Sequence, residues 1–300
     1  MKKISCENAI YFMHRDNKPA LEVEPGELLE FEARDCFSDQ IQEESQLFES
    51  ADWSQINPAT GPVAIKGAEP GDTLVIDILD IKVDDKGTMI VVPDMGALAD
   101  KIDQSETKIV PIVNGYAQFN DKIHLPIKPM IGVIGVAPEG DEKIPNGTPG
   151  FHGGNMDNKK ITRGTRLFLP VFHPGGMLAL GDLHAVMGDG EVVICGVEVP
   201  GEVLLKVDLI KGKTLGTPFL ETPDYFYVIG TGKDLDDAGA VTLDKTYAFL
   251  KERLSLTSNE VAMLMSIACD LEICQIVDPL ITCRMAIPKQ VFALYNLSFA

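Results

Sequence analysis

The sequence has no long apolar run and no cluster of basic residues. No segment of the 300-residue chain approaches the roughly 18 consecutive apolar residues that a membrane-spanning helix requires. The 26 lysines and arginines are outnumbered by 45 acidic residues, which gives a formal net charge of −19. Phosphate groups bind to clustered lysine and arginine side chains, so we expect neither a nucleic acid nor an anionic membrane as a partner.

Cysteine pairs of the CxxC type are also missing. The six cysteines are scattered along the chain, and such a distribution is typical of free thiols in a reducing compartment. Residues 1–20 contain the pair Lys2-Lys3 but no apolar stretch after it, unlike a secretory signal peptide. We therefore expect a cytoplasmic protein.

A proline-glycine turn followed by an alternating apolar segment recurs along the chain. It occurs at residues 24–33, 69–78 and 200–209, and a relaxed copy begins at Arg163. Proline presets the first angle of such a turn, and glycine supplies the positive φ of the next position. The alternation that follows is typical of half-buried strands. The recurrence indicates either a turn that is used repeatedly or a duplicated β-unit, and its irregular spacing argues against a solenoid.

The last third of the chain has a helical pattern. Apolar residues at one face of a helix fall within residues 241–254, at Leu243, Tyr247, Leu250 and Leu254. Thr257 with Glu260 forms a capping-box pattern, which predicts a second helix over residues 261–273.

Two helices joined by so short a loop should lie antiparallel or at a corner and cover one face of a sheet. Their leucine and methionine stripe is more typical of a core than of a binding surface. Residues 280–286 and 290–297 are expected to form a last strand and a closing segment.

These patterns together predict a β-rich fold, sandwich- or barrel-like, with a smaller C-terminal α/β part that carries the two helices. We expect an N-terminal β domain at residues 1–150. The second part, residues 151–300, would hold a polar hairpin and the helices. Between them lies a long loop, residues 132–154, that is rich in proline and glycine; loops of this length are usually functional or mobile.

The polar hairpin is expected at residues 178–199. Residues 178–187 and 191–199 are the predicted strands, and Gly188-Asp189-Gly190 is the turn. Side chains alternate along a strand, so Asp182 and His184 point to the same face. If residues 181–186 pair with 192–197, Glu198 lies diagonally from Asp182 on that face, whereas a one-residue slip would move it to the other. Such a set suits a divalent metal such as zinc; the alternative is a hairpin whose polar face is simply hydrated.

The segment His152-Gly-Gly-Asn155-Met-Asp157 ends the long loop. Two adjacent glycines allow the backbone to approach a ligand or another chain closely. On the residues alone, an ordinary surface turn explains the segment as well as a binding loop does.

Several motifs in order resemble the acetamidase/formamidase family. They are GPVAIKGAEPGDTL (residues 61–74), HGGNMD (152–157), GDLHAVMGDGEV (181–192) and CRMAIPKQVF (283–292), together with EARDC (32–36) and SIACDLEICQIVD (266–278). The resemblance covers roughly residues 20–295. It implies a β-rich fold with a smaller α/β part, hydrolysis of short aliphatic amides, bound metal ions and a homo-oligomer, commonly a dimer.

The resemblance also changes the weight of the candidate residues. It implies that HGGNMD is a site loop, in which Asn155 and Asp157 lie over a metal and orient the amide. It favours Asp182, His184 and Glu198 as metal ligands, and it adds Asp35, which lies in the matching acidic motif. Zinc suits the imidazole-containing set, and calcium would suit an all-oxygen arrangement.

Amide hydrolysis needs a polarised carbonyl, a nucleophile and a proton for the departing ammonia. A divalent metal supplies the first two by activating water, and a nearby free carboxylate can transfer the proton. Asp157 and Glu191 are the candidates for that carboxylate. Glu191 is also explained as a cap of the hairpin turn.

Other mechanisms and functions remain open from the residues. The chain has no Gly-Ser-rich run with a Ser-Ser-Lys system. Cys36 lies beside Arg34-Asp35, but no lysine motif frames it as in nitrilase-like amidases, so a thiol nucleophile is the less favoured mechanism. A metal-binding structural or ligand-binding module without turnover is the alternative to an enzyme.

Overall fold

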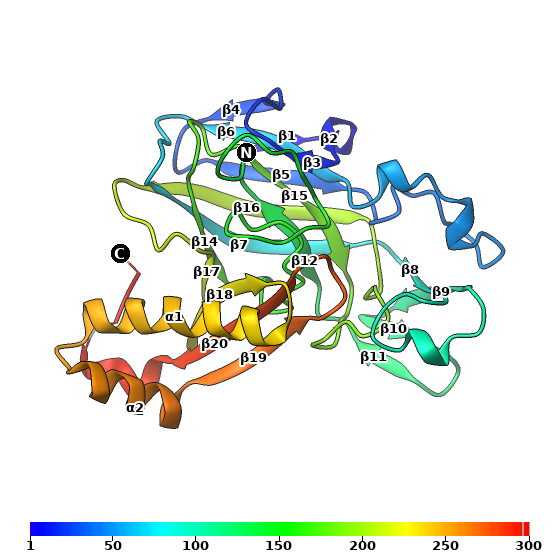
Figure 1. Cartoon of the computed structure of the whole chain (residues 1–300). Helices are drawn as coiled ribbons and strands as arrows, with labels where there is room; N and C mark the ends of the chain where they lie inside the picture. Colours follow the sequence, from blue (N-terminus) through cyan, green and yellow to red (C-terminus); the bar gives the residue numbers. More distant parts are fainter. Residues whose placement is uncertain (296, 300) are drawn as a thin grey trace.

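The computed structural model describes residues 1–295 and 297–299, and its backbone is mainly β-strand (Figure 1). The largest sheet contains strands from the whole length of the chain. Its order is β1 (Lys2–Ile4), β5 (Leu28–Ala33), β16 (Gly201–Ile210), β7 (Thr73–Val83), β14 (Arg166–Pro170), β17 (Phe219–Glu221), β18 (Tyr225–Gly232), β20 (Ile281–Pro288) and β19 (Asp270–Gln275). All its pairs are antiparallel except β1 with β5.

A five-stranded sheet packs on the first half of this sheet. It contains β12 (Met130–Gly135), β15 (Leu178–His184), β6 (Ala59–Ile65), β2 (Ala9–Ile10) and, alongside β6, β4 (Leu21–Val23). Phe31 and Val203 from the large sheet share one buried cluster with Val63, Ile131 and Leu180 from the smaller one. The sandwich-like, β-rich architecture expected from the sequence is thereby confirmed.

Two smaller sheets complete the strands of the described residues. An arm of β8 (Lys86–Val91), β9 (Glu106–Val113), β10 (Tyr116–Gln118) and β11 (His124–Pro126) extends to one side of the sandwich (Figure 1, lower right). The other sheet pairs β3 (Phe12–Met13) with β13 (Ile144–Pro145). Short 3-10 helices lie at Cys6–Asn8, Phe48–Ser50, Trp53–Gln55, Ala99–Lys101 and Lys289–Tyr295.

The two α-helices lie side by side under the second half of the large sheet, as expected (Figure 1). α1 (Leu235–Arg253) begins six residues before the predicted start at 241, because the Asp234 side chain accepts the Asp237 N–H and caps the helix there. α2 (Ser258–Ala268) ends five residues before the predicted residue 273, because Asp270–Gln275 pairs with β20 as β19.

The buried face of α1 also differs from the predicted one. Leu250 and Leu254 are buried, but Leu243 is exposed, and Thr242 faces the sheet instead. A Cβ at Gly230 of β18 would lie 2.5 Å from Thr242 Oγ1, so helix and strand approach closely through small residues. The Thr242 hydroxyl donates to the Ala238 carbonyl oxygen at 2.7 Å and is therefore satisfied. Because Thr242 occupies the buried position in this turn of the helix, Leu243 faces solvent.

The four strands that follow the recurring segments are neighbours in the large sheet, but Pro200-Gly201 forms no turn, and Gly201 is already the first residue of β16. The strands are β5, β16, β7 and β14, in that order across the sheet. Gly26, Gly71 and Gly164 have φ of +91°, +92° and +82°, and a Cβ at each would contact nothing. Their role is therefore conformational freedom at the turn, not close packing.

The division of the chain at residue 150 stays a prediction. Strands from both sides of that position alternate in the large sheet, where β16 lies between β5 and β7. Of the predicted C-terminal elements, the strand at 280–286 corresponds to β20. The closing segment at 290–297 falls largely on the 3-10 helix Lys289–Tyr295, and its residue 296 lies outside the described residues. Among the described residues, we find no helix with the length and apolar character needed to cross a membrane.

Thr257 is predicted to stabilise the fold through the cap of α2. Its side chain accepts the Glu260 N–H, and the Glu260 carboxylate accepts the Thr257 N–H at 2.7 Å. Thr257→Ala should lower the free energy of unfolding by about 1 kcal/mol, because one cap bond is lost. Urea unfolding measures the change. Thr257→Ser keeps the hydroxyl and serves as the control, and equal losses in both variants would contradict the capping role.

Candidate active site

The predicted hairpin forms only in part, and its register differs from the predicted one. β15 ends at His184, and the returning chain makes a single bridge at Glu198, opposite His184. The Ala185 N–H donates to Val197 O and the Val199 N–H to Leu183 O, each at 2.9 Å. His184 therefore pairs with Glu198, whereas the predicted pairing of 181 with 197 would place residue 194 opposite His184.

This four-residue offset leaves the face of every side chain unchanged, because the offset is even and strand side chains alternate with a period of two. Residues 187–196 form a loop in place of the tight turn and the regular second strand. Glu198 consequently lies directly opposite His184, and it stays on a diagonal from Asp182, as predicted. Asp182, His184 and Glu198 therefore meet on one face, as expected, although a longer loop than predicted connects them.

The imidazole of His184 lies among four carboxylates. Its Nε2 is 3.2 Å from Glu198 Oε1, 3.5 Å from Asp182 Oδ1 and 3.6 Å from Asp157 Oδ1. Its Nδ1 is 3.9 Å from Glu191 Oε1. All five side chains are at most 4% exposed, so none of these charges is screened by bulk water.

Asp157 reaches the cluster because the HGGNMD segment packs against β12. The Ile134 N–H donates to Gly154 O at 3.1 Å, and Asn155 forms a bridge with Val133. Gly153 and Gly154 have φ of +95° and +77°, and a Cβ at Gly153 would collide with Ile134 O. The two glycines are therefore required by a close approach of two backbones, and the segment is not an ordinary surface turn.

Glycines also form the walls directly against the cluster. A Cβ at Gly132 would lie 2.5 Å from both Asp157 Oδ1 and Asp182 Oδ2. A Cβ at Gly196 would lie 2.6 Å from His184 Nδ1. Any side chain at either position would displace a functional group.

Burial and neighbouring carboxylates raise the pKa values of Asp157, Glu191 and Glu198. Burial first, and Asp182 second among the raising causes, lifts the pKa of Glu198 to about 8. Burial and Asp182 raise the pKa of Asp157 to about 6. Burial and the neighbouring Asp157 raise the pKa of Glu191 well above its ordinary value. For His184, burial lowers the pKa, but Glu198 and Asp182 outweigh it and the pKa is well above the usual one.

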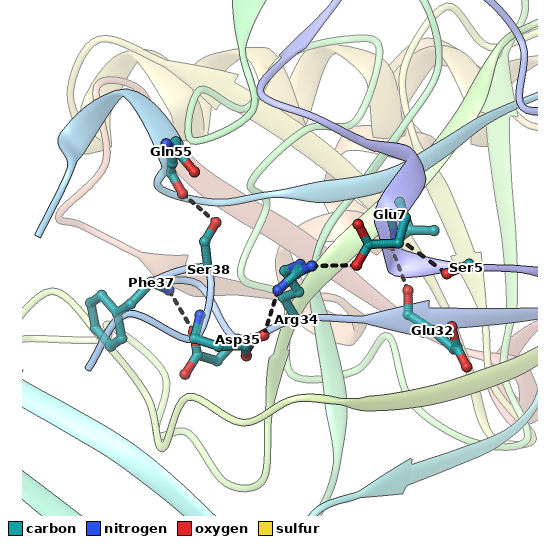
Figure 2. Close-up of polar contacts among 10 residues, drawn as sticks. Ser5, Glu7, Glu32, Arg34, Asp35, Phe37, Ser38 and Gln55 are labelled. Carbon is teal, nitrogen blue, oxygen red and sulfur yellow. Dashed lines mark hydrogen bonds and ion pairs between the residues drawn. The ribbon is translucent and has the colours of Figure 1, made fainter. Parts of the chain in front are cut away.

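Asp35 lies close to this cluster but uses an oxygen to hold its own loop (Figure 2). Its Oδ1 accepts the N–H groups of Phe37 at 3.0 Å and Asp39 at 2.7 Å. Arg34 donates to Asp39 at 3.1 Å and to Glu7 at 2.6 Å, which ties the loop to the N-terminal segment (Figure 2). Burial, and to a smaller extent Asp39 and Asp182, raise the pKa of Asp35 to about 7. Its role as a ligand stays a prediction.

The donor set fits a divalent cation. Within the described residues, two groups have ligand atoms within 4.8 Å of one another: Asp157, His184 and Glu191, and Cys36, Asp182 and Glu198. Buried atoms of the first group, Asp157 Oδ1 and Oδ2, His184 Nδ1 and Glu191 Oε2, have no hydrogen-bond partner, and neither has Glu198 Oε2. Buried carboxylates without partners are costly unless a cation neutralises them.

A pocket of about 520 Å³ opens onto the cluster. Its polar wall consists of the site side chains Asn155, Asp182, His184, Glu191 and Glu198, together with Asp278. Apolar side chains also line the pocket, among them Phe37, Phe48, Ile90, Met95 and Ile194. Asn155 thus lies in the predicted region, with its buried Oδ1 unpaired.

Comparison with known proteins shows the family to which the chain belongs. The acetamidase/formamidase family model matches residues 6–146 and 144–294. The chain belongs to the acetamidase/formamidase family. Its activity is therefore amide hydrolysis, as expected from the motifs, which disfavours a module without turnover.

Solved and curated members of the family match over most of the chain. An acetamidase from Bacillus halodurans is 45% identical, with a TM-score of 0.96 over 98% of this chain and 99% of that one. A protein from Thermoanaerobacter tengcongensis that is described as a predicted acetamidase/formamidase is 42% identical, with a TM-score of 0.97 over 99% of both chains. A formamidase from Methylophilus methylotrophus is 28% identical over 75% of this chain and 72% of its own length.

The sequence reasoning missed Asp278, which lines the pocket of the candidate site beside Asp157. Burial and the neighbouring Asp157 raise its pKa well above the ordinary value, and its Oδ2 is buried without a partner. The segment at 266–278 ends at Asp278 and resembles the family motif, which was the available signal. Its position near Asp157 depends on the path of a loop that local periodicity does not encode.

Cys36 also lines the pocket of the candidate site, but its surroundings oppose a thiolate. Burial first, followed by Glu198 and Asp182, raises the pKa of Cys36 well above its ordinary value. A nucleophilic thiolate needs a positive neighbour that lowers this pKa. The neighbouring carboxylates have the opposite effect, which disfavours the thiol mechanism.

Gly132→Ala should reduce amidase activity at least about tenfold, because the new methyl group must push Asp157 or Asp182 away and misplacements near 1 Å carry penalties of this size. Gly188→Ala is the matched control, because its Cβ would meet nothing within 4 Å and its φ is not positive. Ammonia release measures both variants. Wild-type activity in Gly132→Ala would show that the two carboxylates need not hold their positions.

Proposed function

We propose that the protein hydrolyses short aliphatic amides to a carboxylate and ammonia by means of water activated by a divalent metal. The observation that carries the proposal is the buried imidazole of His184 within 3.2–3.6 Å of three carboxylates. Asp182, His184 and Glu198 are the proposed ligands, with Asp35 as a further candidate. The metal, when bound, would polarise the amide carbonyl and lower the pKa of water towards about 7.

Zinc is the favoured metal and calcium the alternative. An imidazole nitrogen combined with two or three carboxylates is a ligand set typical of zinc. Calcium prefers six to eight oxygen ligands, and the carboxylates of Asp35, Asp157, Asp182, Glu191, Glu198 and Asp278 provide oxygens in the same region. The nitrogen at the centre of the cluster favours zinc.

Asp157 and Glu191 are the proposed proton-transfer groups. One of these carboxylates takes the proton from the attacking water and delivers it to the amide nitrogen as the C–N bond breaks. Burial raises both pKa values, with a further rise from Asp182 for Asp157 and from Asp157 for Glu191, and a raised pKa suits a carboxyl group that must hold and deliver a proton. The two groups lie within one ligand cluster, so the proton can be held by either.

Asn155 and the apolar wall are proposed to orient the substrate. The unpaired Oδ1 of Asn155 can accept an N–H of the primary amide. Phe48, Ile90, Met95 and Ile194 would then contact the acyl chain in the same pocket. This arrangement favours a small aliphatic acyl group.

We also propose that the enzyme works in the cytoplasm as a homodimer or a higher homo-oligomer. The family resemblance supports the oligomer, and the six cysteines, all free in the structure, are typical of a reducing compartment. Light scattering coupled to size exclusion measures the oligomeric state.

His184→Ala should lose the bound metal and the amidase activity together, because the central nitrogen ligand is removed. Metal analysis of the purified variant and ammonia release from acetamide and formamide measure the two effects. A chelator should abolish wild-type activity, and the added metal should restore it. Full activity of His184→Ala without metal would remove the proposal.

Cys36→Ser separates this mechanism from a thiol nucleophile. If a thiolate attacks the amide, the variant should lose at least about 10³-fold of its activity, the scale of losing a nucleophile. If water attacks, activity should stay within a few-fold of the wild type and the metal should remain bound. An inactive variant with its metal retained would transfer the chemistry to the thiol.

Longer acyl groups should be better substrates up to the size of the pocket. Each methylene that enters the apolar wall is worth about 0.8 kcal/mol, so kcat/KM should rise about three- to fourfold per carbon from formamide to butyramide. Phe48→Ala should lower kcat/KM for butyramide and leave that for formamide unchanged. A series in which formamide is the best substrate would contradict contact between the acyl group and this wall.

A further inference from the structure

The most deeply buried charge outside the cluster belongs to Arg284 of β20, whose side chain is 0% exposed. Its guanidinium makes three strong polar contacts with three separate parts of the chain. Nε donates to Glu272 Oε2 at 2.6 Å, Nη1 to Asn158 Oδ1 at 3.0 Å and Nη2 to Asp189 Oδ2 at 2.8 Å. A planar, permanently charged fork can fix several acceptors at once, which a lysine cannot do.

Two of these contacts end next to the proposed proton-transfer groups. Asn158 directly follows Asp157, and Asp189 lies two residues before Glu191. Both acids are in the left-handed backbone region, with φ of +40° at Asp157 and +47° at Glu191. Such conformations persist only where the surrounding structure holds them. Arg284 contacts both segments, through Asn158 and Asp189.

The adjacent hairpin of β19 and β20 also holds the segment that precedes Glu191. The Gly190 N–H donates to Cys274 O at 2.8 Å, and the Ile276 N–H donates to Gly190 O at 3.1 Å. Within the hairpin loop, the buried side chain of Gln275 accepts the N–H groups of Val277 and Asp278 at 2.8 and 3.0 Å. The hairpin therefore supports Glu191 through Gly190 and carries Asp278 in its own loop.

We propose that Arg284 is a positioning residue for amide hydrolysis, which sets Asp157 and Glu191 relative to each other and to His184 through Asn158 and Asp189. The third contact, to Glu272, joins neighbouring strands and contributes to stability alone. This inference rests on the proposed roles of Asp157 and Glu191. It predicts that loss of the ion pair between Arg284 and Asp189 lowers kcat, whereas loss of the ion pair between Arg284 and Glu272 does not.

Asp189 and Glu272 form a matched pair for the test. Both pair with the same guanidinium, at 2.8 and 2.6 Å, and their side chains are 32% and 31% exposed. Asp189→Ala should lower kcat about 10- to 100-fold with KM within twofold of the wild type, the range expected for a displaced catalytic group. Glu272→Ala should lower the melting temperature to a similar extent but keep kcat.

Two further variants separate positioning from loss of structure. Asp189→Asn keeps an oxygen acceptor for Nη2 and should recover most of the lost kcat. Lys159 also pairs with Asp189, at 2.8 Å, so Lys159→Met tests that contact and should keep kcat. Metal content, measured on each variant, should equal that of the wild type.

Four outcomes would overturn the inference: unchanged kcat in Asp189→Ala, an equal loss of kcat in Glu272→Ala, a loss of kcat in Lys159→Met as large as that in Asp189→Ala, or loss of metal in Asp189→Ala. Each would assign Arg284 a role other than placing the proton-transfer groups. A wild-type protein that releases no ammonia from any short amide would instead refute the proposed function. The two failures are therefore distinguishable.

Discussion

The concentration of buried negative charge around one imidazole is the constraint on which the structure depends. Asp157, Asp182, Glu191 and Glu198 surround His184, and all are almost fully removed from solvent. A buried carboxylate is expensive unless it is protonated, paired or bound to a cation. The surrounding fold must therefore hold this set against its own repulsion, and a metal would relieve that repulsion.

The sandwich provides the rigidity that this cluster requires. Asp182 and His184 extend from β15, a strand with neighbours on both sides in the five-stranded sheet. Next to them, β12 contributes Gly132, whose missing side chain leaves space for two carboxylates. Glu198 meets β15 through a single bridge at His184, and Asp157 and Glu191 lie in loops that Arg284 of β20 contacts through Asn158 and Asp189. A rigid strand thus carries two of the proposed ligands, whereas loops held by side-chain contacts carry the proposed proton-transfer groups.

Local patterns in the sequence determined several features correctly. The strand period of two places Asp182 and His184 on one face, and this follows from backbone geometry whatever the neighbouring strand is. Proline-glycine turns mark the start of β5 and β7, because turn geometry depends on only a few consecutive residues. The capping box of Thr257 and Glu260 marks the start of α2 for the same reason. Family motifs identified the HGGNMD segment as a site loop, although its residues alone did not.

The tertiary structure alone decided which distant residues meet. The register of Glu198 depends on the length of the loop at 187–196, and the approach of Asp278 depends on the position of β19 at the edge of a sheet. The period of an apolar pattern does not reveal sheet order or loop path, because both follow from the packing of the whole core. The same holds for Arg284. In the sequence it is one basic residue in a predicted strand, and only the folded chain brings Asn158, Asp189 and Glu272 to it. Sequence therefore determined many of the elements and the shared face of Asp182 and His184, and the packing of the elements determined which other residues join them.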